Sequence, residues 1–242
     1  LEKFERMSKF YIISCHVLWR EISFLAARSR HTFLPHFLKQ GLHNTPDILR
    51  QEVQTAIDAA DKGEYDAILI GYGLCGKGIE GVRARSKPLV LMRGHDCITF
   101  LLGSKERYQE YFDAYPGTYW FSPGWIETTL MPGKERYEKI YNSYREKYGE
   151  EAAEYLMESE QSWVKQYRRA VYVDWGMGDS PACQEYTRQC AEWLGWDMDC
   201  LAGNPRLMAD FLESNWDEEN FLIVQPGKTI FASHDKSVLR AE

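Results

Sequence analysis

Long hydrophobic segments are missing from this chain of 242 residues. No apolar run approaches the roughly 20 residues that a membrane-spanning helix needs, so we expect no membrane association. The stretch from Ile12 to Cys15 mimics a lipoprotein cleavage site. It follows Met7 too closely, however, for the apolar region of a signal peptide to fit between them. We therefore expect a soluble, cytoplasmic protein.

A surplus of positive charge is missing as well. The chain has 29 lysines and arginines against 36 acidic residues, which gives a formal net charge of -7. Phosphate backbones are bound by concentrated basic residues, and no stripe of them occurs here, so we expect no nucleic acid as partner. Internal repeats and low-complexity tracts are also absent.

The six cysteines fall into two groups by position. Without a signal peptide, we expect them to stay reduced or to bind metal, because disulfide frameworks belong to secreted proteins. Cys15, Cys75 and Cys97 each come just after a predicted buried strand, at 9–14, 67–70 and 88–92. We interpret the other three as core residues: Cys183, Cys190 and Cys200.

Strand-like and helix-like segments alternate along the chain, which predicts an α/β fold with a mostly parallel, open sheet. Between 32 and 44 the apolar residues show no clear period, so no regular element is predicted there. We expect parallel strands that begin at Lys9, Ala67, Pro88, Ala170 and Phe221.

The expected organisation is one domain or two closely packed α/β lobes. Charged and aromatic residues alternate between 134 and 169, which predicts long helices. The parts are then an N-terminal α/β lobe at 7–133 with the three cysteines, a helical bridge at 134–169 and a C-terminal α/β segment at 170–242.

Three thiols at three strand ends are the strongest chemical signal in the sequence. Parallel strands end at one edge of their sheet, where ligands bind, and neighbouring strands lie about 5 Å apart. Thiolates are good ligands for soft or borderline metals. His95 lies two residues before Cys97, so both side chains point the same way if the segment is extended. We predict a metal site of Cys15, Cys75, Cys97 and His95.

Two kinds of centre suit these residues. Three thiolates with one open position suit a [4Fe-4S] cluster with a reactive iron. A His-x-Cys pair with another cysteine suits Zn²⁺ that activates a thiol or a water molecule. Free cysteines are also common as buried packing residues, which is the interpretation without a metal.

The turn after the second strand allows a different cofactor. Gly71, Gly73 and Gly76 have the spacing of a dinucleotide fingerprint, so nucleotide or S-adenosylmethionine binding is the alternative. Further glycines discourage the helix that this fingerprint requires. Arg93 and His95 stand where an acidic residue for the ribose is expected.

Two classes of function fit a metal centre here. As an enzyme, the chain would activate a thiol or a small one-carbon or methylated substrate, with His95, Arg93 and Tyr72 as catalytic residues. Arg93 or His43 would then hold an anionic group of the substrate. As an accessory protein, the chain would carry electrons, or deliver a metal or methyl group to a methyltransferase. An open metal position facing a pocket would indicate the enzyme.

Several motifs together resemble the family known as domain of unknown function 1638. The resemblance covers Cys15 to Glu127, and the joint occurrence of two motifs makes it specific. These are Gly71-Tyr72-Gly73-Leu74-Cys75-Gly76 and His95-Asp96-Cys97. Members of that family look like companions of corrinoid-dependent methyltransferase systems in anaerobes. The resemblance thus implies methyl or one-carbon metabolism in an oxygen-poor cytoplasm, with a corrinoid or methyltransferase protein as partner.

A second likeness concerns the donors alone. His95-x-Cys97 with a distant Cys75 is similar to the zinc motif of thiol-directed methyltransferases of the uroporphyrinogen-decarboxylase type. The chain has no Asp-x-His-x-x-Gly motif for cobalamin, so we do not expect it to carry the corrinoid itself.

Overall fold

The computed structural model describes residues 7–242, which divide into two compact units. The first unit is discontinuous and consists of the residues up to Tyr108 together with Asn204–Glu242. The second unit is Gln109–Gly203. The division differs from the expected lobe, bridge and C-terminal segment, because the end of the chain returns to the first unit. The α/β class is confirmed.

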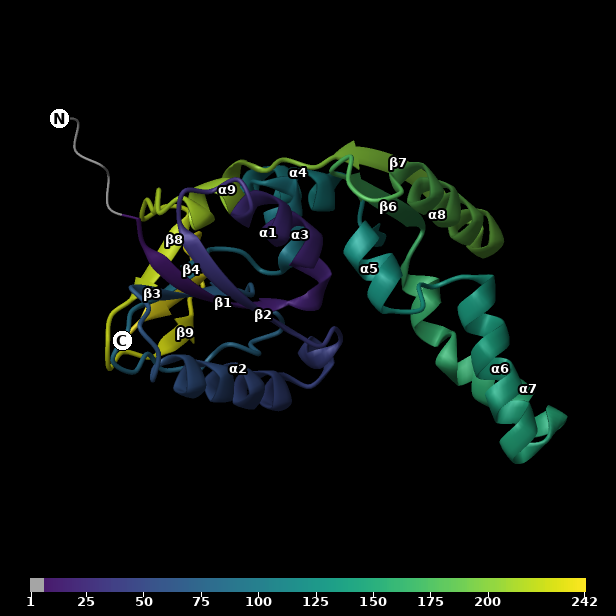
Figure 1. Ribbon diagram of the computed structural model, residues 1–242. Helices are drawn as coiled ribbons and strands as arrows, with labels where there is room; N and C mark the ends of the chain where they lie inside the picture. The colour runs from purple at the N-terminus through teal and green to yellow at the C-terminus, as the bar shows by residue number, and fades with distance from the viewer. Residues whose placement is uncertain (1–6) are drawn as a thin grey trace. The chain divides into compact units, whose positions relative to one another are not determined.

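The first unit is built on a five-stranded sheet in the order β2-β1-β3-β4-β8. Helix α2 lies on one face of this sheet, and α1, α3 and α9 lie on the other (Figure 1). The strands are β1 (Lys9–Cys15), β2 (Thr32–Leu38), β3 (Ala67–Gly71), β4 (Leu89–Met92) and β8 (Phe221–Val224), followed by a hairpin of β9 (Ile230–Ala232) and β10 (Leu239–Ala241). The helices are α1 (Trp19–Ala26), α2 (Pro46–Ala60), α3 (Cys97–Leu102) and α9 (Arg206–Leu212), and the boundary between the units falls within α4 (Lys105–Ala114).

Helix α2 shows how local sequence and burial agree in this unit. Pro46 occupies the first helical position, where its missing N–H costs nothing and its fixed φ suits a helix. Leu49, Val53 and Ile57 follow at helical spacing and are fully buried. Removing such side chains from water stabilises the fold by about 1.5–3 kcal/mol each.

Two features of this sheet depart from the expectation. Strands β1 to β4 pair in parallel, but β8 is antiparallel to β4, with Phe221 opposite Met92. The parallel orientation expected for the strand at Phe221 is therefore wrong. Strand β2 occupies a region where no element is predicted. It is an edge strand with mostly exposed or half-buried side chains, and Pro35 lies within it.

The second unit is built on a parallel three-stranded sheet in the order β5-β6-β7. Helix α8 packs on β6 and β7, while α6 and α7 pack on each other. The strands are β5 (Thr118–Phe121), β6 (Arg169–Asp174) and β7 (Asp197–Ala202), and the helices are α5 (Pro123–Thr128), α6 (Lys134–Tyr148), α7 (Glu150–Glu160) and α8 (Ser180–Leu194), with a 3-10 turn, η3, at Ser162–Gln166.

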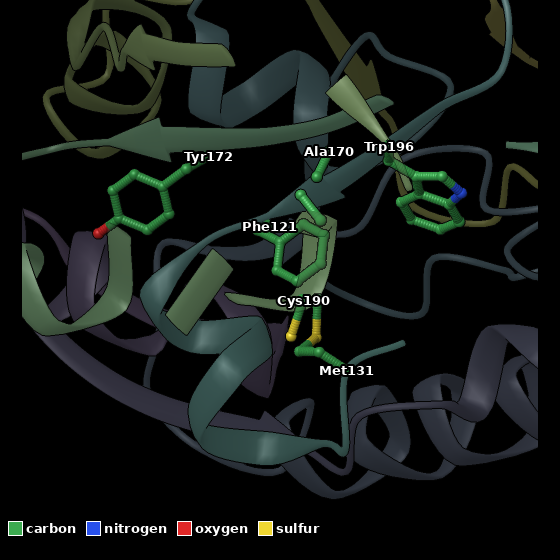
Figure 2. Close-up of a cluster of buried hydrophobic side chains, with 7 residues drawn as sticks. Phe121, Met131, Ala170, Tyr172, Cys190 and Trp196 are labelled. Carbon is green, nitrogen blue, oxygen red and sulfur yellow. The ribbon is translucent and has the colours of Figure 1, made fainter. Parts of the chain in front are cut away.

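The core of the second unit lies between its sheet and α8. Figure 2 shows Phe121 and Cys190 directed toward Met131. Cys190 is buried, which confirms its interpretation as a core residue. Cys183 is half-buried and packs against this core. Cys200 is exposed, so its assignment to the core is wrong. Among residues 7–242 no helix is long and apolar enough to cross a membrane.

Candidate functional site

The three predicted cysteines come from three neighbouring strands of the first unit. β1 is followed in sequence by β2 on one side, but β3 pairs with it on the other, so the strand order reverses between β1 and β3. Ligands of open α/β sheets bind at the carboxyl ends of the strands beside such a reversal. Cys15 is the last residue of β1, Cys75 lies in the loop after β3, and Cys97 begins α3 after β4.

Backbone hydrogen bonds join the loops that carry Cys75 and Cys97. The amide of Leu74 donates to the carbonyl of Gly94 at 2.9 Å, and the amide of Cys75 donates to the carbonyl of His95 at 2.8 Å. Gly73 permits this approach, since a Cβ there would lie 2.8 Å from both the Gly94 oxygen and the Asp96 nitrogen. Gly73 therefore allows the two loops to lie in contact.

Tyr72 lies near all three cysteines and is only 3% exposed. Burial raises the pKa of its hydroxyl far above the ordinary value, and Cys15, Cys75 and Cys97 raise it further. The hydroxyl forms no hydrogen bond of good geometry with any residue from 7 to 242. The Cys15 thiol lies within its reach as a poorly aligned partner. Tyr72 thus presents a buried hydroxyl group close to thiols.

The thiols themselves lie in surroundings that oppose ionisation. Burial raises the pKa of Cys15, while hydrogen bonds from the Val17 backbone and from Tyr72 lower it. Burial also raises the pKa of Cys75, and the nearby Asp96 and Cys15 raise it further. The ionisable neighbours that act on Cys75 are therefore acids, whose negative forms oppose the ionisation of its thiol. Cys75 also has a left-handed backbone with φ 45°, which is uncommon outside glycine.

Asp96 connects this group to α3 and to a histidine. Its carboxylate accepts from the amide of Ile98 at 3.0 Å, as the N-cap of α3, and from the Tyr108 hydroxyl at 2.9 Å. Burial raises the pKa of Asp96, and these hydrogen bonds together with His95 lower it. Burial lowers the pKa of His43, and Asp96 opposes that effect. Asp96 and His43 thus lie in electrostatic contact.

Asp96 is not among the predicted site residues, although a signal for it was present. An Asp directly after a buried strand and before the apolar run from Ile98 is a typical N-cap. His95, which is predicted as a ligand, is an exposed residue whose charge acts on Asp96.

Arg93 serves the scaffold through its guanidinium group. Its Nε donates to the carbonyls of Glu218 at 3.0 Å and Phe221 at 2.9 Å. Its Nη1 donates to the carbonyls of Ser237, at 3.0 Å, and Leu239. These contacts fasten the C-terminal segment to the end of β4, and they give no support to the predicted binding of an anionic substrate group by Arg93.

The predicted cofactors are a metal centre and, as the alternative, a nucleotide or S-adenosylmethionine. As arranged, no three His, Cys, Asp or Glu side chains of the described chain form a group that could hold a metal ion. Between β3 and β4 the structure contains turns and no helix. The Gly71–Gly76 turn therefore lacks the helix N-terminus that binds a dinucleotide pyrophosphate.

Comparison with known proteins places the site within one family. A family model with the description "Protein of unknown function (DUF1638)" matches residues 37–212. That range includes the loops of Cys75 and Cys97 and begins after Cys15. No curated protein and no solved structure matches the chain.

Proposed function

Since the chain belongs to the DUF1638 family, whose description assigns no activity, we propose a function from its own residues: a metal-centre protein of anaerobic methyl or one-carbon metabolism. One observation supports this most directly. Cys15, Cys75 and Cys97 come from three adjacent strand ends, and all three act electrostatically on the buried hydroxyl of Tyr72. This group lies beside the reversal in strand order, where α/β sheets bind ligands.

The charge balance of the group favours a cationic ligand. The group consists of acids, which are neutral when protonated and negative when ionised: Cys15, Tyr72, Cys75 and Asp96. Burial raises the pKa of each. A bound metal is often the largest local charge in such a site, and it deprotonates a coordinating thiol. The donor chemistry of these residues therefore fits a metal centre.

The spacing of the donors favours a cluster over a single ion. Zinc–sulfur bonds are about 2.3 Å long, so tetrahedral zinc requires its ligand atoms within about 4 Å of one another. Within residues 7–242 no three His, Cys, Asp or Glu side chains form a group that could hold a single metal ion. A [4Fe-4S] cluster keeps its cysteines farther apart, because iron and sulfide lie between them. We therefore favour the cluster, with Zn²⁺ as the second possibility.

The protein residues have separate tasks in this proposal. Cys15, Cys75 and Cys97 bind the centre, and the Tyr72 hydroxyl donates to a thiolate sulfur. Hydrogen bonds to the sulfurs are one means by which a protein sets a reduction potential. Asp96 fixes the start of α3 and so positions Cys97. When bound, the cluster supplies electron transfer or an iron that accepts an external ligand.

Three cysteines leave one iron of such a cluster without a protein thiolate. That iron suits the activation of a small thiol or methylated substrate, with His43 and His95 near the carboxylate of Asp96. The same centre suits an accessory protein that serves a corrinoid or methyltransferase partner, as the resemblance implies. Either role belongs in an oxygen-poor cytoplasm, where thiols stay reduced.

The test is metal analysis of protein purified without oxygen. We expect near one cluster per chain, measured as iron and acid-labile sulfide. Substitution of Cys15, Cys75 or Cys97 by Ser removes a ligand from a site that exists only in the folded chain, so metal content and melting temperature should fall together.

Two other cysteines provide the matched control. Cys183→Ser and Cys200→Ser change cysteines of the second unit, and they should leave the metal content unchanged. If the protein contains zinc and no sulfide, the centre is the zinc site and not the cluster. The metal proposal is contradicted if the wild-type protein contains neither iron nor zinc near one centre per chain.

A further inference from the structure

The second unit contains a cavity of about 440 Å³, a volume within the range typical of small-molecule sites. Its walls come from α6, from the stretch between α7 and β6, and from the end of α8 with the turn that follows. All of these segments belong to the second unit, so the cavity does not involve the cysteine group of the first unit.

Aromatic rings dominate the walls of this cavity. Tyr137 and Trp193 form one pair, with ring centroids 5.4 Å apart, and Tyr167 and Trp196 form another at 5.9 Å. Trp193 is 42% exposed, an unusual position for so large an apolar side chain. Flat, rigid walls of this kind favour a planar ligand, because rings gain most from stacked or edge contacts.

The charge on the lining has one sign. Lys165 and Arg168 are its only charged residues, and both are exposed. Neither side chain has an ion pair in the described part of the chain. The two cations therefore remain available to a ligand, and the same positive charges disfavour a cationic guest among the aromatic rings. An anionic group satisfies them, with Arg168 able to bind it through two parallel hydrogen bonds.

We propose that this cavity is a second ligand site, which takes a planar aromatic or conjugated small molecule bearing a carboxylate or a similar anionic group. The ring system lies against Trp193, Trp196 and their tyrosine partners, and the anionic group lies at Lys165 and Arg168. The site is independent of the metal centre, so either proposal can fail without the other.

A pair of fluorescent probes tests the proposal on the full-length protein. Anilinonaphthalene sulfonate has a planar body and an anionic group, and phenylnaphthylamine has the same rings without the sulfonate. We expect the sulfonate to bind at one site per chain. Arg168→Ala together with Lys165→Ala should weaken its binding at least tenfold, while binding of the neutral probe should change less than twofold. Trp193→Ala should weaken both probes.

One control tests for a general effect of positive charge, and another tests whether each variant is folded. Lys147→Ala removes an exposed lysine of α6 that is not part of the cavity lining, and it should leave both affinities unchanged. Melting curves of each variant show that the fold is retained, since probes of this type also bind loosened proteins. The proposal is overturned if the sulfonate binds the double variant as tightly as wild type, binds at many sites, or does not bind at all.

Discussion

Arg93 joins the end of β4 to the C-terminal segment through hydrogen bonds to backbone carbonyls. A lone arginine after a buried strand, next to His95 and Cys97, indicates an anion site when only the sequence is considered. The carbonyls that it binds belong to residues more than 120 positions later, at Glu218 to Leu239. No local pattern predicts such a contact, because the acceptors are backbone atoms, which every residue carries.

Arg93→Met should therefore destabilise the first unit. The substitution keeps an apolar stem but leaves several partly buried carbonyls without their donor, and we expect a loss of about 3 kcal/mol of unfolding free energy. Urea denaturation measures it. The control is Arg240→Met, which removes an ion pair whose partners are 53% and 60% exposed, so it should cost below about 1 kcal/mol. Equal losses in the two variants would contradict the scaffold role.

The cysteines, by contrast, could be placed from sequence. Cys15, Cys75 and Cys97 each follow a run of buried apolar residues, and a strand with no polar interruption is easy to recognise. The structure places all three near Tyr72. What the sequence could not provide was the closeness of the two loops, which depends on hydrogen bonds between backbone groups and on the space left at Gly73.

At the scale of elements, buried strands and helix α2 are predictable, whereas edge strands and strand direction are not. β2 escapes prediction because its side chains are mostly exposed or half-buried, so no apolar period remains. β8 is recognisable as a strand, yet an apolar run reads the same in both directions. Its antiparallel pairing with β4 joins residues far apart in the sequence, and no local pattern specifies the direction.

A second prediction concerns Gly133, in the loop before α6, which lies against Cys190 of α8. A Cβ at Gly133 would lie 2.8 Å from the Cys190 sulfur, which belongs to the packed core of the second unit. Gly133→Ala should therefore cost about 1–3 kcal/mol of unfolding free energy through overpacking, in addition to the backbone strain of its φ of 154°. The cost should shrink when Cys190→Ala is combined with it, because the clashing sulfur is then gone.

Gly149→Ala is the matched control for that experiment. Gly149, like Gly133, has an extended backbone with positive φ, at φ 85° and ψ 169°, and a Cβ there would meet nothing within 4 Å. Its substitution should cost only the backbone strain of about 1–3 kcal/mol. A cost of Gly133→Ala that Cys190→Ala does not relieve would show that the contact with α8 is not the cause.

At the scale of the molecule, the second unit is an insertion within the first. The returning chain at Asn204 donates its amide to the carbonyl of Leu101 at 3.0 Å, so the chain re-enters at the end of α3. Replacement of 109–203 by a short Gly/Ser linker should therefore leave a folded protein with the five-stranded sheet. We expect one cooperative thermal transition by circular dichroism, and the metal content of the full chain. A chain that stays unfolded would show that the first unit depends on the second.

The interrupted first unit also sets an order of events during translation. Cys15, Cys75 and Cys97 are all synthesised before the second unit begins at Gln109, so the proposed metal centre could be loaded before the chain is complete. β4, however, cannot pair with its neighbour β8 until the ribosome has synthesised the chain from Met92 to Phe221. At the ordinary pace of synthesis this delay is on the order of 10 s, during which an apolar strand edge stays unpaired. We therefore expect the nascent chain to be prone to aggregation through this edge during that interval.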